Sequence, residues 1–205
     1  MIFRILEKEK KLLLRQAPEF RDAVKTIRLR SFACAPDLFQ ALVQSIVSQQ
    51  LAVKAADAIY ARLEKLLGKL TPENLNDASD EALRTCGLSM RKIEYLRGIA
   101  QAVLTNTLDL HALRKMDDQA VIRELVKLKG VGEWTAEMLL IFALGRRDVL
   151  SAKDLGIQRG IMLLNHLDKL TPEEFARFKK RYSPCGTLAS LYLWRIKDGG
   201  LSIGK

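Results

Sequence analysis

Asp154 is the side chain in this sequence that is best placed to do chemistry. It follows the short apolar pair Val149-Leu150 and a turn of small residues, and it precedes a strongly apolar helical stretch. An aspartate in this position most often caps the helix, and the local pattern alone favours that role. The cap is compatible with catalysis, because orphan N–H groups and the positive end of the helix dipole keep a carboxylate ionised. An ionised carboxylate can stabilise a positive charge that develops during a reaction.

Gly130 and Gly132 form a Gly-x-Gly turn within the stretch from Leu128 to Ala136. Apolar residues at helical spacing lead into the turn and out of it, so the pattern predicts two helices joined by a tight hairpin. The first N–H groups of the second helix would bind an anion, and glycine lets a phosphate approach the main chain closely. An ordinary αα-hairpin gives the same pattern, since a lone Gly-x-Gly is a weak signal.

Trp134 and Trp194 are the two tryptophans of the chain. An aromatic residue at helical spacing fills the core by default. Trp134, however, follows Gly132 by two residues and falls in the first turn of the predicted helix, where its ring can face a cleft and stack on a base. Gln49 and Gln50 lie at the corner between two apolar helices, where polar residues need no functional explanation, although two long amides there can also probe a groove.

The charge of the chain favours a polyanionic partner. It contains 34 Lys and Arg against 24 Asp and Glu, which gives a net charge of +10. A solvated basic surface without a special partner is the plain alternative. Arg91, Lys92 and Arg159 are candidates for a basic footprint on nucleic acid.

The cysteines and histidines argue against a metal cluster. Three scattered cysteines and two histidines show no zinc or iron–sulfur spacing, and their pattern is typical of reduced thiols. The chain has no apolar core of signal-peptide length and no run of membrane-spanning length. We therefore expect an intracellular protein, cytoplasmic if the source is bacterial, that needs no cofactor.

The hydrophobic pattern predicts an all-α fold of about ten helices with short connections. Two short helices are expected between residues 6 and 30, broken near Pro18. Val149-Leu150 is the nearest approach to a strand and is too short to be one. Ser183 or Thr187 is expected to open the last helix. The other helix starts are predicted at Asp37, Thr71, Ser79, Ser89, Asp117 and Thr171.

With these positions placed, the chain resembles the helix–hairpin–helix DNA glycosylase superfamily. Within it, the resemblance is closest to the monofunctional alkylpurine enzymes, the 3-methyladenine DNA glycosylase II group. Each matching piece is modest alone, whereas their order and spacing over roughly residues 30–197 are highly specific. The pieces are Ile46-Val47-Ser48-Gln49-Gln50-Leu51, Gly87-Leu88-Ser89 followed by Lys92 and Tyr95, Leu128 through Ala136, and Asp154-Leu155-Gly156-Ile157.

The resemblance implies one glycosylase unit over residues 1–205, built from two helical lobes. The middle lobe would span about 37–115. The second lobe would combine about 1–36 with 116–205 and contain the hairpin at about 121–144. The family places an everted nucleotide in the cleft between the lobes and anchors DNA at its edge through the hairpin.

The resemblance also implies a role for individual residues. Asp154 falls at the position of the family's catalytic aspartate. Trp134 stands where strand-cleaving relatives have a lysine nucleophile, and an indole cannot form a Schiff base, so base excision without lyase activity is expected. Trp134, Trp194 and Met138 would line the base pocket, although some members have a tyrosine at the position of Met138.

DNA contacts are implied at the hairpin and at the helix corner. The expected contact residues are Gly130, Val131, Gly132, Thr135, Gln50 and Leu51, the last two lying about where the family inserts a wedge into the base stack. Ala52 replaces a common serine and so loses a helix cap. No metal ligand is expected among the side chains, while an alkali cation on the hairpin carbonyls is an option.

The expected activity is therefore excision of flipped alkylated purines, of the 3-methyladenine and 7-methylguanine type, from double-stranded DNA. Hydrolysis of the N-glycosidic bond would leave an abasic site, and the protein is expected to act as a monomer. The main alternative is a non-catalytic helix–hairpin–helix DNA-binding module. A third interpretation, an oxidised-base glycosylase with lyase activity, is disfavoured by Trp134.

Overall fold

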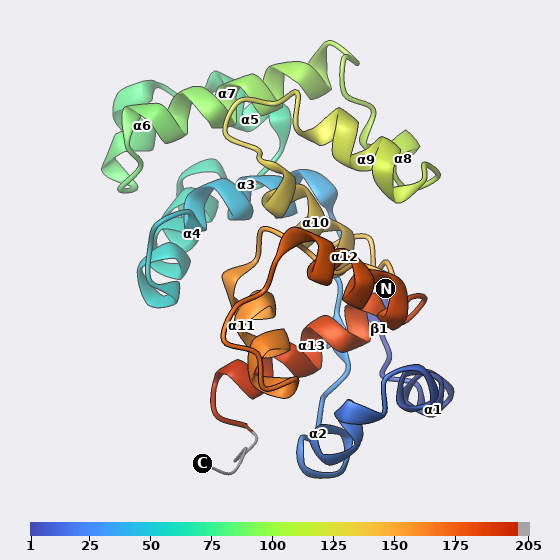
Figure 1. Cartoon of the computed structure of the whole chain (residues 1–205). Helices are drawn as coiled ribbons and strands as arrows, with labels where there is room; N and C mark the ends of the chain where they lie inside the picture. The colour runs from blue at the N-terminus through green and yellow to red at the C-terminus, as the bar shows by residue number, and fades with distance from the viewer. Residues whose placement is uncertain (201–205) are drawn as a thin grey trace. The chain divides into compact units, whose positions relative to one another are not determined.

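The computed structural model describes residues 1–200, and it confirms the all-α prediction (Figure 1). These residues contain thirteen α-helices, one short 3-10 helix and two strands of two residues each. The number exceeds the predicted ten, and the helix Leu110–Leu113 had no predicted start because four residues are too few to show a helical period. None of the helices in this part of the chain is long and apolar enough to cross a membrane.

The chain divides into two compact units. The terminal unit combines residues 1–34 with the chain from Leu140 onward, and the middle unit spans residues 35–139. We expected residues 116–139 to group with the termini, whereas their contacts place them in the middle unit.

Two side-chain contacts within the middle unit involve the hairpin turn. The side chain of Gln49 donates a hydrogen bond to the main-chain oxygen of Gly130. The ammonium group of Lys129 forms an ion pair with Glu94. Both contacts tie the hairpin turn to the helices that precede it in the sequence.

The middle unit is organised around its longest helices. Helix α7 contacts α3, α5 and α6, and α3 also packs on α4. The apolar residues of α7 recur every three to four positions, so they form one buried stripe. The elements are α3 (Leu38–Ser48), α4 (Val53–Leu67), α5 (Pro72–Asp77), α6 (Asp80–Thr85), α7 (Met90–Leu104), α8 (Leu110–Leu113), α9 (Asp118–Leu125) and α10 (Glu133–Phe142), which continues past Leu139 into the other unit.

The helices of the middle unit begin at the predicted capping residues. The side chains of Asp37, Thr71, Ser79, Ser89 and Asp117 each accept a hydrogen bond from the main-chain N–H three residues later. Helix α4 begins after Ala52, which makes no side-chain cap in the described structure, as expected. Short polar side chains at these positions therefore fix where the helices start.

The terminal unit joins segments from both ends of the sequence, drawn in blue and in orange to red in Figure 1. Its core surrounds α13, where Phe20, Tyr182 and Tyr192 are fully buried. Helix α13 approaches α11 so closely that a Cβ on Gly160 would lie 2.5 Å from the main-chain oxygen of Leu193. The elements are β1 (Ile2–Phe3), α1 (Glu7–Gln16), the 3-10 helix η1 (Pro18–Phe20), α2 (Arg21–Thr26), β2 (Phe32–Ala33), α11 (Leu155–Leu164), α12 (Pro172–Tyr182) and α13 (Gly186–Lys197).

The start of α13 differs from the prediction. Neither Ser183 nor Thr187 caps the helix, which begins after Cys185. Asp148 accepts a hydrogen bond from the main-chain N–H of Gly186 at 2.9 Å, and its other carboxylate oxygen accepts one from the hydroxyl of Ser183. The helix is therefore capped by a residue 38 positions away, which local patterns do not reveal.

The strands were also not predicted. Strands β1 and β2 pair antiparallel, with Ile2 opposite Ala33 and Phe3 opposite Phe32. Two residues are too few to show a period of two in the sequence, and the pairing is long-range. The rings of Phe3 and Phe32 stack at 4.9 Å, which adds an aromatic contact to the ladder.

Candidate functional site

Asp154 lies at the N-terminus of α11 and is largely buried, with 7% of its surface exposed. Its Oδ1 atom accepts a hydrogen bond from the main-chain N–H of Ile157 at 2.8 Å. The predicted cap is therefore confirmed. A second donor, the indole N–H of Trp194, reaches the same oxygen at 3.1 Å. The carboxylate is thus fixed in orientation by one main-chain and one side-chain donor.

Trp194 comes from α13, forty residues after Asp154 in the sequence. Its ring is half-buried and stacks on Phe142, with centroids 5.9 Å apart and planes inclined by 20°. Sequence reasoning assigned Trp194 to the base pocket alone. The structure adds a contact with the carboxylate itself, which the sequence did not signal because the two residues lie on different helices.

Gly156 makes room for this contact. A Cβ at this position would lie 3.0 Å from Asp154 Oδ1 and 3.0 Å from Cδ1 of Trp194. Any larger residue would therefore push the indole or the carboxylate aside. The Asp-Leu-Gly-Ile segment thus supplies the carboxylate, the main-chain donor of Ile157 and the gap that admits the indole.

The two glycines of the hairpin differ in their surroundings. Gly130 has φ of +86°, and a Cβ there would lie 2.3 Å from the ring of Tyr95, so the fold itself requires glycine. Gly132 is exposed, and no described atom lies within 4 Å of the position of its Cβ. Its main chain is therefore open to an approaching group. Val131 and Thr135, by contrast, are buried.

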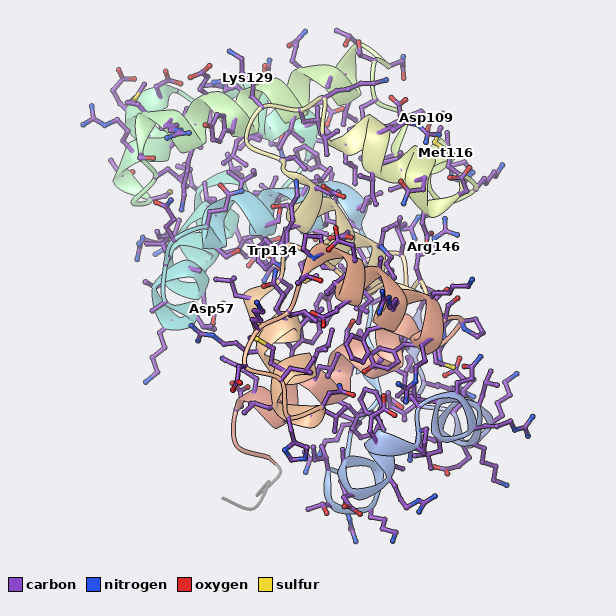
Figure 2. All side chains as sticks on the ribbon, in the orientation of Figure 1. Asp57, Asp109, Met116, Lys129, Trp134 and Arg146 are labelled. Atoms are coloured by element: carbon purple, nitrogen blue, oxygen red, sulfur yellow. The ribbon has the colours of Figure 1, made fainter. Side chains whose placement is uncertain are left out.

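Trp134 is exposed to 44%, in the first turn of α10 (Figure 2). It therefore does not fill the core of the middle unit. Met138 lies one turn later on the same helix and is half-buried. The structure thus places these two candidate pocket residues on one helix, four positions apart.

The corner between α3 and α4 presents two candidate DNA contacts. Gln50 is exposed and has φ of +57°, which is uncommon for a residue with a side chain. Leu51 is exposed to 40%. Sequence reasoning did not identify what holds this corner: the ammonium group of Lys92 donates to the main-chain oxygens of Val47 and Gln49, at 2.7 and 2.9 Å.

The described residues contain no group of three or more His, Cys, Asp or Glu side chains that could hold a metal ion. An alkali cation at the hairpin would have to use main-chain oxygens. Those of Leu128, Gly130 and Gly132 each already accept one hydrogen bond. A carbonyl oxygen has two lone pairs, so each of these oxygens can accept a hydrogen bond and still bind a cation. The alkali cation therefore stays a prediction.

Comparison with known proteins agrees with this arrangement. Residues 43–184 match the family model described as HhH-GPD superfamily base excision DNA repair protein. DNA-3-methyladenine glycosylase 1 of Schizosaccharomyces pombe is 36% identical over 162 residues, which cover 77% of this chain and 71% of the relative. A putative DNA-3-methyladenine glycosylase of Bacillus subtilis is 30% identical, and the match spans 58% of its length.

Solved structures give the same result. The crystal structure of a DNA-3-methyladenine glycosidase from Bacillus halodurans has a TM-score of 0.86 at 40% identity and covers 96% of this chain and 92% of its own. A 3-methyladenine DNA glycosylase of Schizosaccharomyces pombe in complex with abasic DNA has a TM-score of 0.74 at 33% identity, with 94% and 93% covered.

The chain therefore belongs to the HhH-GPD superfamily of base excision DNA repair proteins. The resemblance drawn from the sequence motifs is confirmed, and DNA glycosylase activity in base excision repair is the function that its relatives support. A non-catalytic binding module is correspondingly disfavoured.

Proposed function

We propose that this protein is a monofunctional glycosylase that removes alkylated purines from double-stranded DNA by hydrolysis and acts as a monomer. The observation that carries the proposal is the Asp154 carboxylate, held at the start of α11 by Ile157 and Trp194. The names of the relatives support the substrate class, because they include 3-methyladenine glycosylases that match most of this chain.

The reaction begins with eversion of the damaged nucleotide, since the target bond cannot be reached inside a duplex. Eversion costs less at damaged or weakly paired bases, which already favours lesions. The exposed Gln50-Leu51 corner is suited to enter the gap that the base leaves. The open main chain at Gly132, at the start of a helix, is suited to hold a backbone phosphate.

The lesion is then bound through its charge. Alkylation at N3 or N7 makes the purine cationic, and an indole face attracts a cation by about 0.5–2 kcal/mol. Trp134 offers an exposed ring for this contact, and Met138 shares its helix. A neutral purine lacks the charge and gains less from the same ring.

Asp154 serves the chemical step. As the bond between C1′ and the purine nitrogen breaks, its electron pair leaves with the base, which becomes neutral. The sugar gains positive charge, which the Asp154 carboxylate stabilises. Water forms the new bond to C1′ and gives up a proton, so the products are a free base and an abasic site. Trp134 provides no amine for a Schiff base, and the strand stays intact.

The test is incubation of the protein with methylated duplex DNA, followed by chromatography of the released bases. We expect 3-methyladenine and 7-methylguanine above the spontaneous rate, with strand breaks only after alkali treatment. DNA binding without base release would instead indicate a non-catalytic module. Strand breaks before alkali, or a borohydride-trapped covalent complex, would contradict the monofunctional assignment.

A further inference from the structure

Lys92 joins two elements that are distant in the sequence. It lies in the first turn of α7, and its ammonium group donates to the main-chain oxygens of Val47 and Gln49. Helix α3 ends at Ser48, and the last carbonyls of a helix lack partners within it and attract a cation. Lys92 therefore caps the C-terminus of α3 from more than forty residues away.

Gln49 continues the connection toward the hairpin. Its side-chain amide donates to the main-chain oxygen of Gly130 at 2.8 Å. One turn further along α7, on the same face of the helix as Lys92, the ring of Tyr95 occupies the space next to Gly130. Tyr95 is itself held by a hydrogen bond and a cation–π contact from Arg91. The hairpin turn is thus held by a side chain of the corner and by an aromatic ring of α7.

This geometry gives Lys92 a role other than the basic footprint expected from the sequence. Lys92 is half-buried, burial lowers its pKa, and its ammonium group already serves two main-chain oxygens. Lys129 differs: its side chain is 78% exposed and pairs with Glu94 at the surface (Figure 2). A cation committed to helix carbonyls is poorly suited to neutralise a phosphate.

The corner needs such support. Gln50 adopts a left-handed conformation, which is unfavourable for a residue with a side chain and persists only where the surroundings enforce it. Gln50 and Leu51 are also exposed, so few contacts of their own fix them. The two hydrogen bonds from Lys92 fix the main chain immediately before Gln50.

We propose that Lys92 and Gln49 are positioning residues that hold the Gln50-Leu51 corner and the hairpin turn in one fixed arrangement. The hairpin then binds the DNA backbone while the corner, held at a fixed distance from it, enters the base stack. The rigid corner makes base eversion efficient. This inference rests on the proposed function, because it assigns the corner to eversion. Lys92 contacts neither base nor sugar in it and acts through the main chain of residues 47–49.

The experiment compares Lys92→Met and Gln49→Met with the control Lys65→Met, which removes the same charge as Lys92→Met from an exposed side chain of α4, away from the corner and the hairpin. Base release is measured under single-turnover conditions for a lesion in a paired duplex and for the same lesion left unpaired. We expect Lys92→Met to slow the paired substrate by about tenfold, because small displacements of positioning groups have large effects on rate. The unpaired substrate should lose much less, since its eversion cost is lower.

Gln49→Met should mainly weaken binding to abasic DNA, because it removes the hydrogen bond to the hairpin carbonyl of Gly130. The control variant should release base from the paired and the unpaired substrate at wild-type rates. Equal losses on paired and unpaired substrates would indicate a merely structural role and overturn the proposal. So would wild-type behaviour of Lys92→Met. Because the two residues share one connection, their effects should also be non-additive in the double variant.

Hydrogen exchange of residues 47–53 separates this proposal from the proposed function. If the wild-type protein released no base, the glycosylase assignment would fail. Faster exchange at the corner in Lys92→Met, with the rest of the middle unit unchanged, is the expected sign of lost positioning. Unchanged exchange there would contradict the role of Lys92 even in an active enzyme.

Discussion

Trp194 contributes to the candidate site through its indole N–H as well as its ring. The N–H donates to Asp154 Oδ1, while the ring stacks on Phe142. Gly156 leaves the space in which the two side chains meet. The carboxylate that we propose as the catalytic group is therefore oriented by a residue that the sequence suggested only for base contact.

Replacing Trp194 by Phe separates these two contributions. The variant keeps an aromatic ring against Phe142 and loses the donor to Asp154. A hydrogen bond to a charged group is worth about 1.5–3 kcal/mol, so we expect the single-turnover rate of base release to fall by at least about tenfold. Abasic DNA binding should be retained. An unchanged rate would show that the indole N–H has no part in orienting the carboxylate.

Tyr192 supplies a control on the same helix and a prediction of its own. Its hydroxyl is buried and has no hydrogen-bond partner among residues 1–200. An unsatisfied buried hydroxyl costs about 1 kcal/mol or more, so Tyr192→Phe should raise the free energy of unfolding by about that amount at pH 8. Urea denaturation measures it, and base release should be unaffected.

The same hydroxyl predicts a dependence on pH. Burial raises the pKa of Tyr192 to about 12 in the folded protein, against about 10 in an unfolded chain. Because the folded pKa is the higher one, this contribution to stability is complete below pH 10 and is lost as the pH rises through 12. The advantage of Tyr192→Phe over wild type should therefore grow in this window. A constant difference between pH 8 and pH 11 would contradict it.

At the scale of elements, the hairpin glycines predict opposite phenotypes. Gly130→Ala places a Cβ against Tyr95 in a left-handed conformation, so it should lower the melting temperature by several degrees. Gly132→Asp meets no described atom, so the fold should tolerate it. Its carboxylate would repel phosphate, and binding to duplex DNA should weaken. Calorimetry and fluorescence anisotropy distinguish the two; unchanged affinity of Gly132→Asp would remove the hairpin from the contact surface.

Local patterns predicted most of the helical elements. Helix starts at Asp37, Ser89, Asp117, Asp154 and Thr171 depend on a polar side chain and a main-chain N–H three residues later, so short-range sequence contains the whole signal.

Long-range contacts were not predictable in this way. Asp148 caps α13 from a distant loop, β1 pairs with β2 across about thirty residues, and Lys92 caps α3. Each depends on how the chain returns on itself, which no local spacing reveals. For the site, the sequence identified Asp154 but not its contact with Trp194, since the donor lies forty residues away on another helix.

At the scale of the whole molecule, the net charge of +10 predicts salt-sensitive binding. Each phosphate neutralised by a lysine or arginine releases counterions, so the logarithm of the association constant should fall linearly with the logarithm of salt concentration. Titration of undamaged duplex DNA at several salt concentrations measures this slope. A slope near zero would show that the basic residues are not organised for DNA.

In the proposed mechanism, different groups bind the DNA and carry out the chemistry. Asn is as good a helix cap as Asp, so Asp154→Asn should preserve the start of α11 while it removes the negative charge. The most direct test measures single-turnover base release from methylated duplex DNA and affinity for abasic DNA in this variant. We expect release to fall by about 10²-fold or more with binding largely retained. Undiminished release, or equal loss of release and binding, would contradict the assignment of Asp154 as the catalytic carboxylate.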